Sequence, residues 1–222
     1  MVLRRFIVLL TLLLLSGGSK AQIDDVRLWT GVSIQHKFTR RLTGSIEEQL
    51  RFRNDITQID QVFTDAGLSY QLFKNFKIAL NYRFVRKNEH NYYSIAHRFY
   101  LDAAYRFKTG RIAFTLRERV MEQYKDYNSS ELGKIPEWLL RSKLTAKFDM
   151  QRKYSPYIGA EMYYVIDNAK EKDNLISRIR YSAGVEYEFN RIHSLDVFVL
   201  LQHDRPDDFN SFVFGTSYCY TF

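Results

Sequence analysis

From residue 26 onward, apolar and polar side chains alternate along almost the whole chain. In the segment 76–87, for example, one face would carry Phe76, Ile78, Leu80, Tyr82 and Phe84. The positions between them include lysine, arginine and asparagine. Successive side chains of a β-strand point to opposite faces, whereas a helix repeats every 3.6 residues. The pattern therefore predicts an all-β protein whose strands each have one apolar and one polar face.

The alternation divides the chain into eleven segments, at 26–38, 42–53, 58–72, 76–87, 93–107, 111–123, 137–148, 155–166, 176–189, 194–203 and 210–222. Most of them have about 12 to 15 residues, roughly twice the usual soluble strand. A tilted strand crosses a membrane with only ~9–11 residues. The links alternate between short turns and longer polar stretches. Together these features predict a transmembrane antiparallel up-and-down β-barrel with short periplasmic turns and longer extracellular loops.

The number of segments conflicts with this fold, because bacterial single-chain barrels have an even number of strands. Either the first segment lies outside the closed wall, which leaves ten strands, or one segment merges two strands, which gives twelve. We therefore expect a barrel of 10 to 12 strands.

Aromatic residues make up 16% of the chain, and many of them lie near the ends of the segments. Membrane barrels carry such aromatic girdles at the level of the lipid headgroups. The polar faces carry too many charges to form a dry core. We therefore expect the apolar faces to contact lipid and the polar faces to line the lumen.

Residues 1–21 have the features of a cleaved signal peptide. Arg4 and Arg5 precede an apolar run from 6 to 15, and Ser19-Lys20-Ala21 is a small-x-small cleavage site. The apolar run is too short to span a bilayer, which takes ~20 residues. The mature chain, residues 22–222, is expected to form one barrel in the outer membrane. Residues 22–222 hold 30 basic and 25 acidic residues. The resulting net charge of +5 is mild and evenly spread, which argues against nucleic acid as a partner.

The chain ends on "SFVFGTSYCYTF", with aromatic residues at every second position. This ending is typical of the signal that the barrel-assembly machinery reads on the last strand. We expect Tyr218, Tyr220 and Phe222 to form that signal on the lipid-facing side. Outer-membrane lipid and, during biogenesis, the assembly machinery are therefore the expected partners.

Three stretches resemble a known family. These are Trp29 soon after the cleavage site, "EEQLRFR" in the second segment, and "RIRYSAGVEYEFNRIHSLDVFVLLQHD" near the end. They are similar to the bacterial family catalogued as domain of unknown function 2490. The resemblance implies an outer-membrane barrel, and it implies no activity, ligand or catalytic residue.

The inward faces are rich in charge. The lumen-facing candidates are Arg51, Arg53, Arg83, Arg98, Asp102, Arg106, Arg117, Arg119, Arg141, Lys143, Arg178, Arg180, Glu186 and Glu188. One interpretation is a lumen filled by ion pairs, because small barrels are just wide enough for side chains to fill. The other is a cationic passage for small anionic solutes. We expect a structural role or small-solute passage, with the solute left open.

Two glutamates break the alternation. Glu48 and Glu118 fall on faces that should contact lipid. We expect a β-bulge or a shifted register to turn them inward.

An alternative function is a membrane-embedded acyl hydrolase or acyltransferase with a Ser/His/carboxylate site near the barrel rim. The candidate pairs are Ser94 with His97 and Ser211 with His203. No histidine pair has metal-ligand spacing. The sequence therefore favours a protein without a catalytic site, metal or cofactor.

Overall fold

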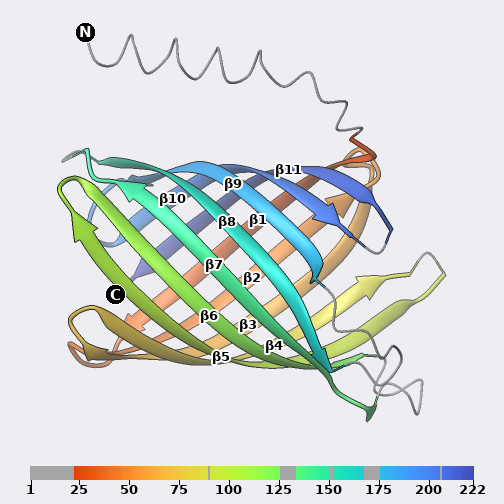
Figure 1. The fold of residues 1–222 in the computed structure, drawn as a ribbon, viewed down its shortest axis with the longest axis horizontal. Coiled ribbons are helices and arrows are strands. Elements are labelled where there is room, and N and C mark those ends of the chain that lie inside the picture. The colour runs from red at the N-terminus through yellow and green to blue at the C-terminus, as the bar shows by residue number, and fades with distance from the viewer. Residues whose placement is uncertain (1–22, 90, 126–133, 151–152, 168–175, 206) are drawn as a thin grey trace, which may run out of the picture.

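The structure, a computed structural model of the chain, describes residues 23–89, 91–125, 134–150, 153–167, 176–205 and 207–222. In these residues eleven strands pair edge to edge into one closed barrel, with the strands inclined to the barrel axis (Figure 1). They are β1 (Asp25–Lys37), β2 (Leu42–Arg53), β3 (Gln58–Phe73), β4 (Phe76–Asn88), β5 (Tyr93–Thr109), β6 (Ile112–Lys125), β7 (Glu137–Phe148), β8 (Tyr154–Asp167), β9 (Ile176–Glu188), β10 (His193–Asp204) and β11 (Phe209–Thr221). The predicted barrel is confirmed. The predicted leader, residues 1–21, lies outside the described residues.

The barrel closes through a parallel pair of strands. β1 pairs with β11 from Asp25 opposite Ser211 to Gln35 opposite Thr221, and every other neighbouring pair is antiparallel. When strands alternate in direction around a closed ring, an odd number leaves one parallel pair. Both explanations offered for the odd count were therefore wrong, because β1 lies in the wall and no segment merges two strands.

The parallel closure places the two ends of the barrel sequence at opposite ends of the barrel. The links at one end, called the turn end, span 38–41, 74–75, 110–111, 149–153 and 189–192. The links at the other end, called the loop end, span 54–57, 89–92, 126–136, 168–175 and 205–208. β1 begins at the loop end, and the C-terminus lies at the turn end (Figure 1).

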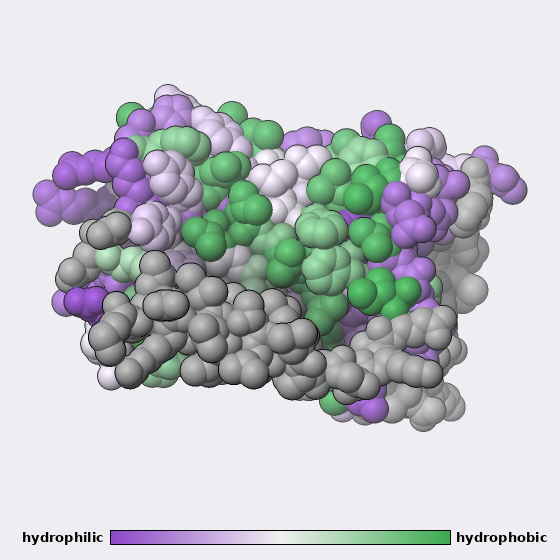
Figure 2. Space-filling model, turned by 90° about the horizontal axis from the view of Figure 1, so that it is seen from above, coloured by the Kyte–Doolittle hydropathy of each residue, from purple (hydrophilic) through white to green (hydrophobic). Residues whose placement is uncertain are grey.

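The outer surface has the polarity of a membrane protein. Figure 2 shows hydrophobic residues gathered over the middle of the wall and hydrophilic residues toward both ends. Large aliphatic side chains are strongly exposed at mid-strand positions, among them Leu80 (63% exposed) and Ile158 (64%). Among the described residues, no helix is both long and apolar enough to cross a membrane.

A small apolar cluster holds the inner side of the closure. Trp29 of β1, Leu200 of β10 and Val213 of β11 are buried together, and Phe198 packs against them. The Phe198 ring lies across Gly215, where an added Cβ would be 2.0 Å from the ring Cζ. Glycine at position 215 therefore permits this packing, which fixes Trp29 inside the lumen.

Candidate functional site in the barrel lumen

A layer of arginine and aromatic side chains crosses the lumen. We call it the arginine–aromatic layer. Each of the strands β1 to β9 contributes one member: Trp29, Arg51, Phe63, Arg83, Tyr100, Arg119, Arg141, Tyr163 and Arg180. Four members are aromatic and five are arginines, so guanidinium groups can stack on rings from neighbouring strands.

The first half of the layer is a continuous stack. The Cζ of Arg51 lies 3.8 Å from the centroid of the Trp29 ring and 4.9 Å from that of Phe63. The Cζ of Arg83 lies 3.8 Å from the Phe63 centroid, and that of Arg119 lies 3.7 Å from the Tyr100 centroid. Such cation–π contacts contribute about 0.5–2 kcal/mol each, more where water is excluded.

The second half of the layer reaches back to β1 past β10 and β11. The Cζ of Arg141 lies 4.4 Å from the Tyr163 centroid. The Cζ of Arg180 lies 4.8 Å from the Tyr163 centroid and 5.1 Å from the Trp29 centroid. Since Arg119 and Arg141 are register partners on β6 and β7, the layer forms a circuit that narrows the lumen.

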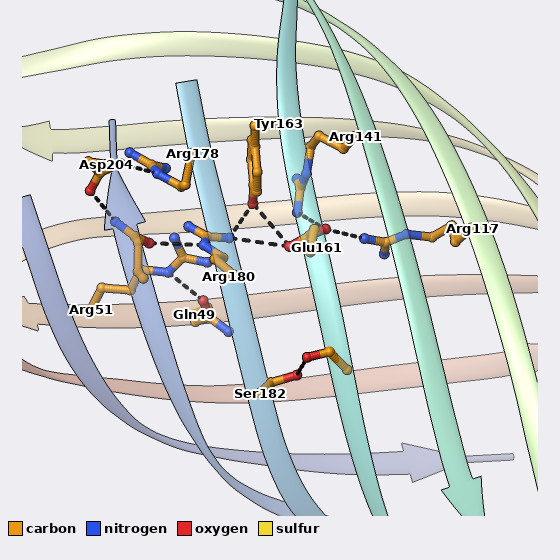
Figure 3. Close-up of polar contacts among 12 residues, drawn as sticks. Gln49, Arg51, Arg117, Arg141, Glu161, Tyr163, Arg178, Arg180, Ser182 and Asp204 are labelled. Atoms are coloured by element: carbon orange, nitrogen blue, oxygen red, sulfur yellow. Dashed lines mark hydrogen bonds and ion pairs between the residues drawn. The ribbon is translucent and has the colours of Figure 1, made fainter. Parts of the chain in front are cut away.

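Glu161 of β8 is the charge centre of this layer (Figure 3). Its Oε1 accepts hydrogen bonds from Arg117 (2.7 Å) and Arg141 (2.8 Å). Its Oε2 lies 3.6 Å from Nη1 of Arg180 and accepts a hydrogen bond from the Tyr163 hydroxyl (3.3 Å). One buried carboxylate therefore neutralises three arginines only in part.

Other carboxylates near the layer each pair with a single arginine. Arg83 donates to Asp65 at 2.7 Å. Arg119 holds Asp102 through two parallel hydrogen bonds of 2.6 and 2.7 Å. On the loop side of the layer, Arg178 donates to Asp204 (Figure 3). These pairs fill space and fix the orientation of the guanidinium planes.

In the middle of the lumen, three cations have no carboxylate partner within the described residues. Arg51 donates only through its Nε, to Gln49 at 2.6 Å. Arg98 and Lys143 form no ion pair in this part of the chain. An unpaired charge in a low-dielectric interior is unfavourable. The middle of the lumen therefore carries a positive excess.

A cavity of about 370 Å³ lies against the layer and extends toward the turn end. We call it the turn-side chamber. Ser33 and Gln35 line it after Trp29 on β1, and Tyr157 lines it near the start of β8. All three residues lie on the turn side of the layer. The lumen is thus partly hollow there and narrowed at the layer.

The remaining predicted lumen residues lie nearer the two ends. At the loop end Arg53 lies 3.6 Å from Asp60. Toward the turn end Glu186 pairs with Lys147 at 2.6 Å. Arg106 and Glu188 are exposed near the turn end. The structure therefore brings together the mid-strand candidates and leaves these terminal ones apart.

Sequence reasoning missed the aromatic members of the layer and Glu161. Phe63 has the same parity as Gln61 and Asp65 on β3, so its inward position could have been found by counting along the strand. Glu161 and Tyr163 share parity on β8 in the same way. Their role as a hub could not be found, because it depends on which arginines neighbouring strands bring opposite them.

Glu48 and Glu118 lie on the outer face, contrary to our expectation. The pairing runs without a shift past Glu48 on β1 and β3 and past Glu118 on β5 and β7. Thr64 donates a hydrogen bond to Glu48 (2.6 Å), and Ser142 donates to Glu118 (2.5 Å). A hydroxyl on the next strand thus satisfies part of each outward carboxylate, and no bulge is required.

The candidate catalytic pairs are not assembled. Ser94 and His97 occupy positions of opposite parity on β5, and His97 contacts the Tyr82 hydroxyl at 2.7 Å. The Ser94 hydroxyl instead donates to Glu89 in the link between β4 and β5 (3.2 Å). Although partial burial raises the pKa of the Glu89 carboxyl, hydrogen bonds from Lys87 and Ser94 bring that pKa below its usual value.

The second pair is separated in the same way. Ser211 is buried on the inner side of β11, whereas His203 contacts Asn210, whose position has the opposite parity (2.9 Å). Among the described residues there is also no group of three or more histidine, cysteine or acidic side chains that could hold a metal ion.

A closed barrel with a charged lumen and an apolar outer band defines the class of outer-membrane-type β-barrel proteins. Within this class, the chain belongs to the protein family of unknown function DUF2490, whose model matches residues 26–212. The resemblance predicted from the sequence is therefore confirmed. No curated protein matches the chain.

Solved barrels resemble this fold. The KdgM porin in complex with disordered oligogalacturonate is 16% identical, with a TM-score of 0.46 over 79% of this chain and 88% of that one. The translocator domain of the autotransporter NalP from Neisseria meningitidis is 10% identical, with a TM-score of 0.45 over 79% of this chain and 72% of that one.

Proposed function

We propose that the protein resides in the outer membrane and lets small solutes pass, with a preference for anions, through a lumen constricted by the arginine–aromatic layer. Charge supports this proposal most strongly. Seven cationic side chains but only four carboxylates line the cavity against the layer. Fixed positive charges in a narrow pore with low-dielectric walls attract anions and repel cations.

The barrel wall and the predicted leader support the location. An apolar band around a closed barrel matches a bilayer, and residues 1–21 would direct export. The turn end, which holds the C-terminus, would then face the periplasm. A lipid-modifying enzyme receives no comparable support, because the serine and the histidine of each candidate pair lie on opposite faces of the wall.

Ion flux from liposomes that contain the refolded protein tests the proposal. Internal chloride should exchange for external nitrate faster than internal potassium exchanges for external sodium. Arg51→Gln should reduce this difference because it removes a cation without a carboxylate partner. Lys108→Gln is the control, since Lys108 is exposed near the turn end and pairs with Asp149. Flux equal to that of empty vesicles would favour a purely structural role, and faster potassium release would contradict the proposal.

A further inference from the structure

The turn-side chamber has the size of a ligand site. Its volume of about 370 Å³ falls within the range of ~300–1,000 Å³ that is usual for small-molecule pockets. Without a ligand, the chamber would hold roughly a dozen waters, at about 30 Å³ each. A lumen that served only as packing would not need this space beside the layer.

The chamber presents hydrogen-bond donors that the protein itself does not use. Within the described residues, the half-buried Lys143 ammonium has no hydrogen-bond or ion-pair partner. The terminal amino groups of Arg51 have none either, because only its Nε donates, to Gln49. Both residues line the chamber. Their charges favour an anionic group on any ligand.

The chamber also presents acceptors and hydroxyl groups. Glu47 receives only one long hydrogen bond in this part of the chain, from Gln49 at 3.4 Å. Asp196 uses one oxygen for the Tyr157 hydroxyl (2.9 Å), and its Oδ1 is buried without a partner. Ser45 adds a hydroxyl group to the same wall. A simple anion would leave these carboxylates without donors.

A ligand that carries both an anionic group and hydroxyl groups would match both sets. Its carboxylate would lie near Lys143 and Arg51, and its hydroxyl groups would donate to Glu47 and Asp196. Trp29 also lines the chamber, so an apolar face is available for the carbon chain. We infer that the turn-side chamber is a binding site for a small hydroxylated anion, of the class of sugar acids and hydroxy acids. This inference rests on the proposed function, because the site lies in the same lumen.

Trp29 provides a direct readout. Trp29 and Trp138 are the two tryptophans of the chain, and Trp138 does not line the chamber. A Trp138→Phe background therefore reports the environment of Trp29 alone. Three probes at equal concentration separate the contributions: gluconate has charge and hydroxyl groups, acetate has charge only, and glucitol has hydroxyl groups only.

Gluconate should change the Trp29 fluorescence saturably, with an affinity at least about tenfold higher than that of acetate or glucitol. Lys143→Gln should weaken gluconate binding by about tenfold or more, the usual effect of losing one charged hydrogen bond. Lys147→Gln is the matched control, because Lys147 lies on the same strand and face, pairs with Glu186 and does not line the chamber. It should bind gluconate like the parent.

Equal affinities for gluconate and acetate, or no binding of gluconate, would overturn the inference. This comparison uses the Trp138→Phe protein, in which no lumen residue is changed. An unchanged affinity in a folded Lys143→Gln barrel would overturn it as well. Liposome flux separates the two proposals. Anion-selective flux without gluconate binding would contradict the binding site and leave the proposed passage standing. Gluconate binding without anion selectivity would contradict the proposed passage.

Discussion

The backbone amide of Phe222 donates a hydrogen bond to the carbonyl oxygen of Gln35, with 2.9 Å between the nitrogen and the oxygen. The Lys37 amide in turn donates to the Phe222 carbonyl at 3.0 Å. The last residue is thus part of the parallel closure between β1 and β11. Its ring lies on the outer face, with its centroid 4.6 Å from that of His36.

This arrangement separates two effects of the terminal residue. Phe222→Ala keeps the backbone bonds and removes the ring, so refolding into detergent should be nearly unchanged while outer-membrane levels in cells fall. Deletion of Phe222 also removes two closing hydrogen bonds, worth about 0.5–1.5 kcal/mol each, and should lower both quantities. Normal cellular levels of Phe222→Ala would show that the aromatic ring is not part of an assembly signal.

The outward and inward faces can be compared at two adjacent residues. Leu80 is 63% exposed on the outer face, where an arginine costs ~2–4 kcal/mol at the middle of the bilayer. Asn81 lines the turn-side chamber. Leu80→Arg should therefore reduce the yield of folded, heat-modifiable barrel in lipid far more than Asn81→Arg. Equal losses would contradict the assignment of faces.

The hub of the layer should be sensitive to the loss of one charge. Glu161→Gln leaves Arg117, Arg141 and Arg180 without their shared carboxylate, and breaking such a buried group typically costs about 3–5 kcal/mol. Urea unfolding in lipid vesicles should show this decrease in the free energy of unfolding. Glu186→Gln is the control, because its pair with Lys147 is about one-third exposed and should contribute at most ~1 kcal/mol. Similar values for both variants would rule out the hub.

How much of this could be predicted from sequence differs between the wall and the lumen. Every strand lies within two residues of its predicted segment, because the period-two alternation is a local property. The parallel pairing of Asp25 with Ser211 is a consequence of closing the whole ring and leaves no local signal. Likewise, the contacts of Glu161 on β8 depend on the register of β6 with β7, of β7 with β8 and of β8 with β9, which a single sequence does not specify.

For the two outward glutamates, the sequence predicted the face correctly and the local backbone wrongly. Alternation placed Glu48 and Glu118 on the lipid face correctly, and the general rule against charge in lipid led us to expect a bulge. The rule failed locally because Thr64 and Ser142 supply hydrogen bonds from the next strand.

The position of Glu48 makes its replacement stabilising. Glu48→Leu should raise the free energy of unfolding in lipid vesicles, on the order of 1–2 kcal/mol, because an outward carboxylate opposes insertion. Glu48→Gln, which removes the charge but keeps an acceptor for Thr64, should give an intermediate value. A decrease for Glu48→Leu would mean that the bond with Thr64 outweighs the contact with lipid.

The conductance of the barrel in planar bilayers tests most directly whether the arginine–aromatic layer is the constriction of the lumen. Phe63 is 1% exposed and Trp29 is 6% exposed, and together they support the stack of Arg51 and Arg83. Truncating both to alanine should open the layer without changing the outer face. The Trp29→Ala/Phe63→Ala barrel should conduct several times more current than the parent and remain selective for anions. Equal conductance of the two folded barrels would contradict the account.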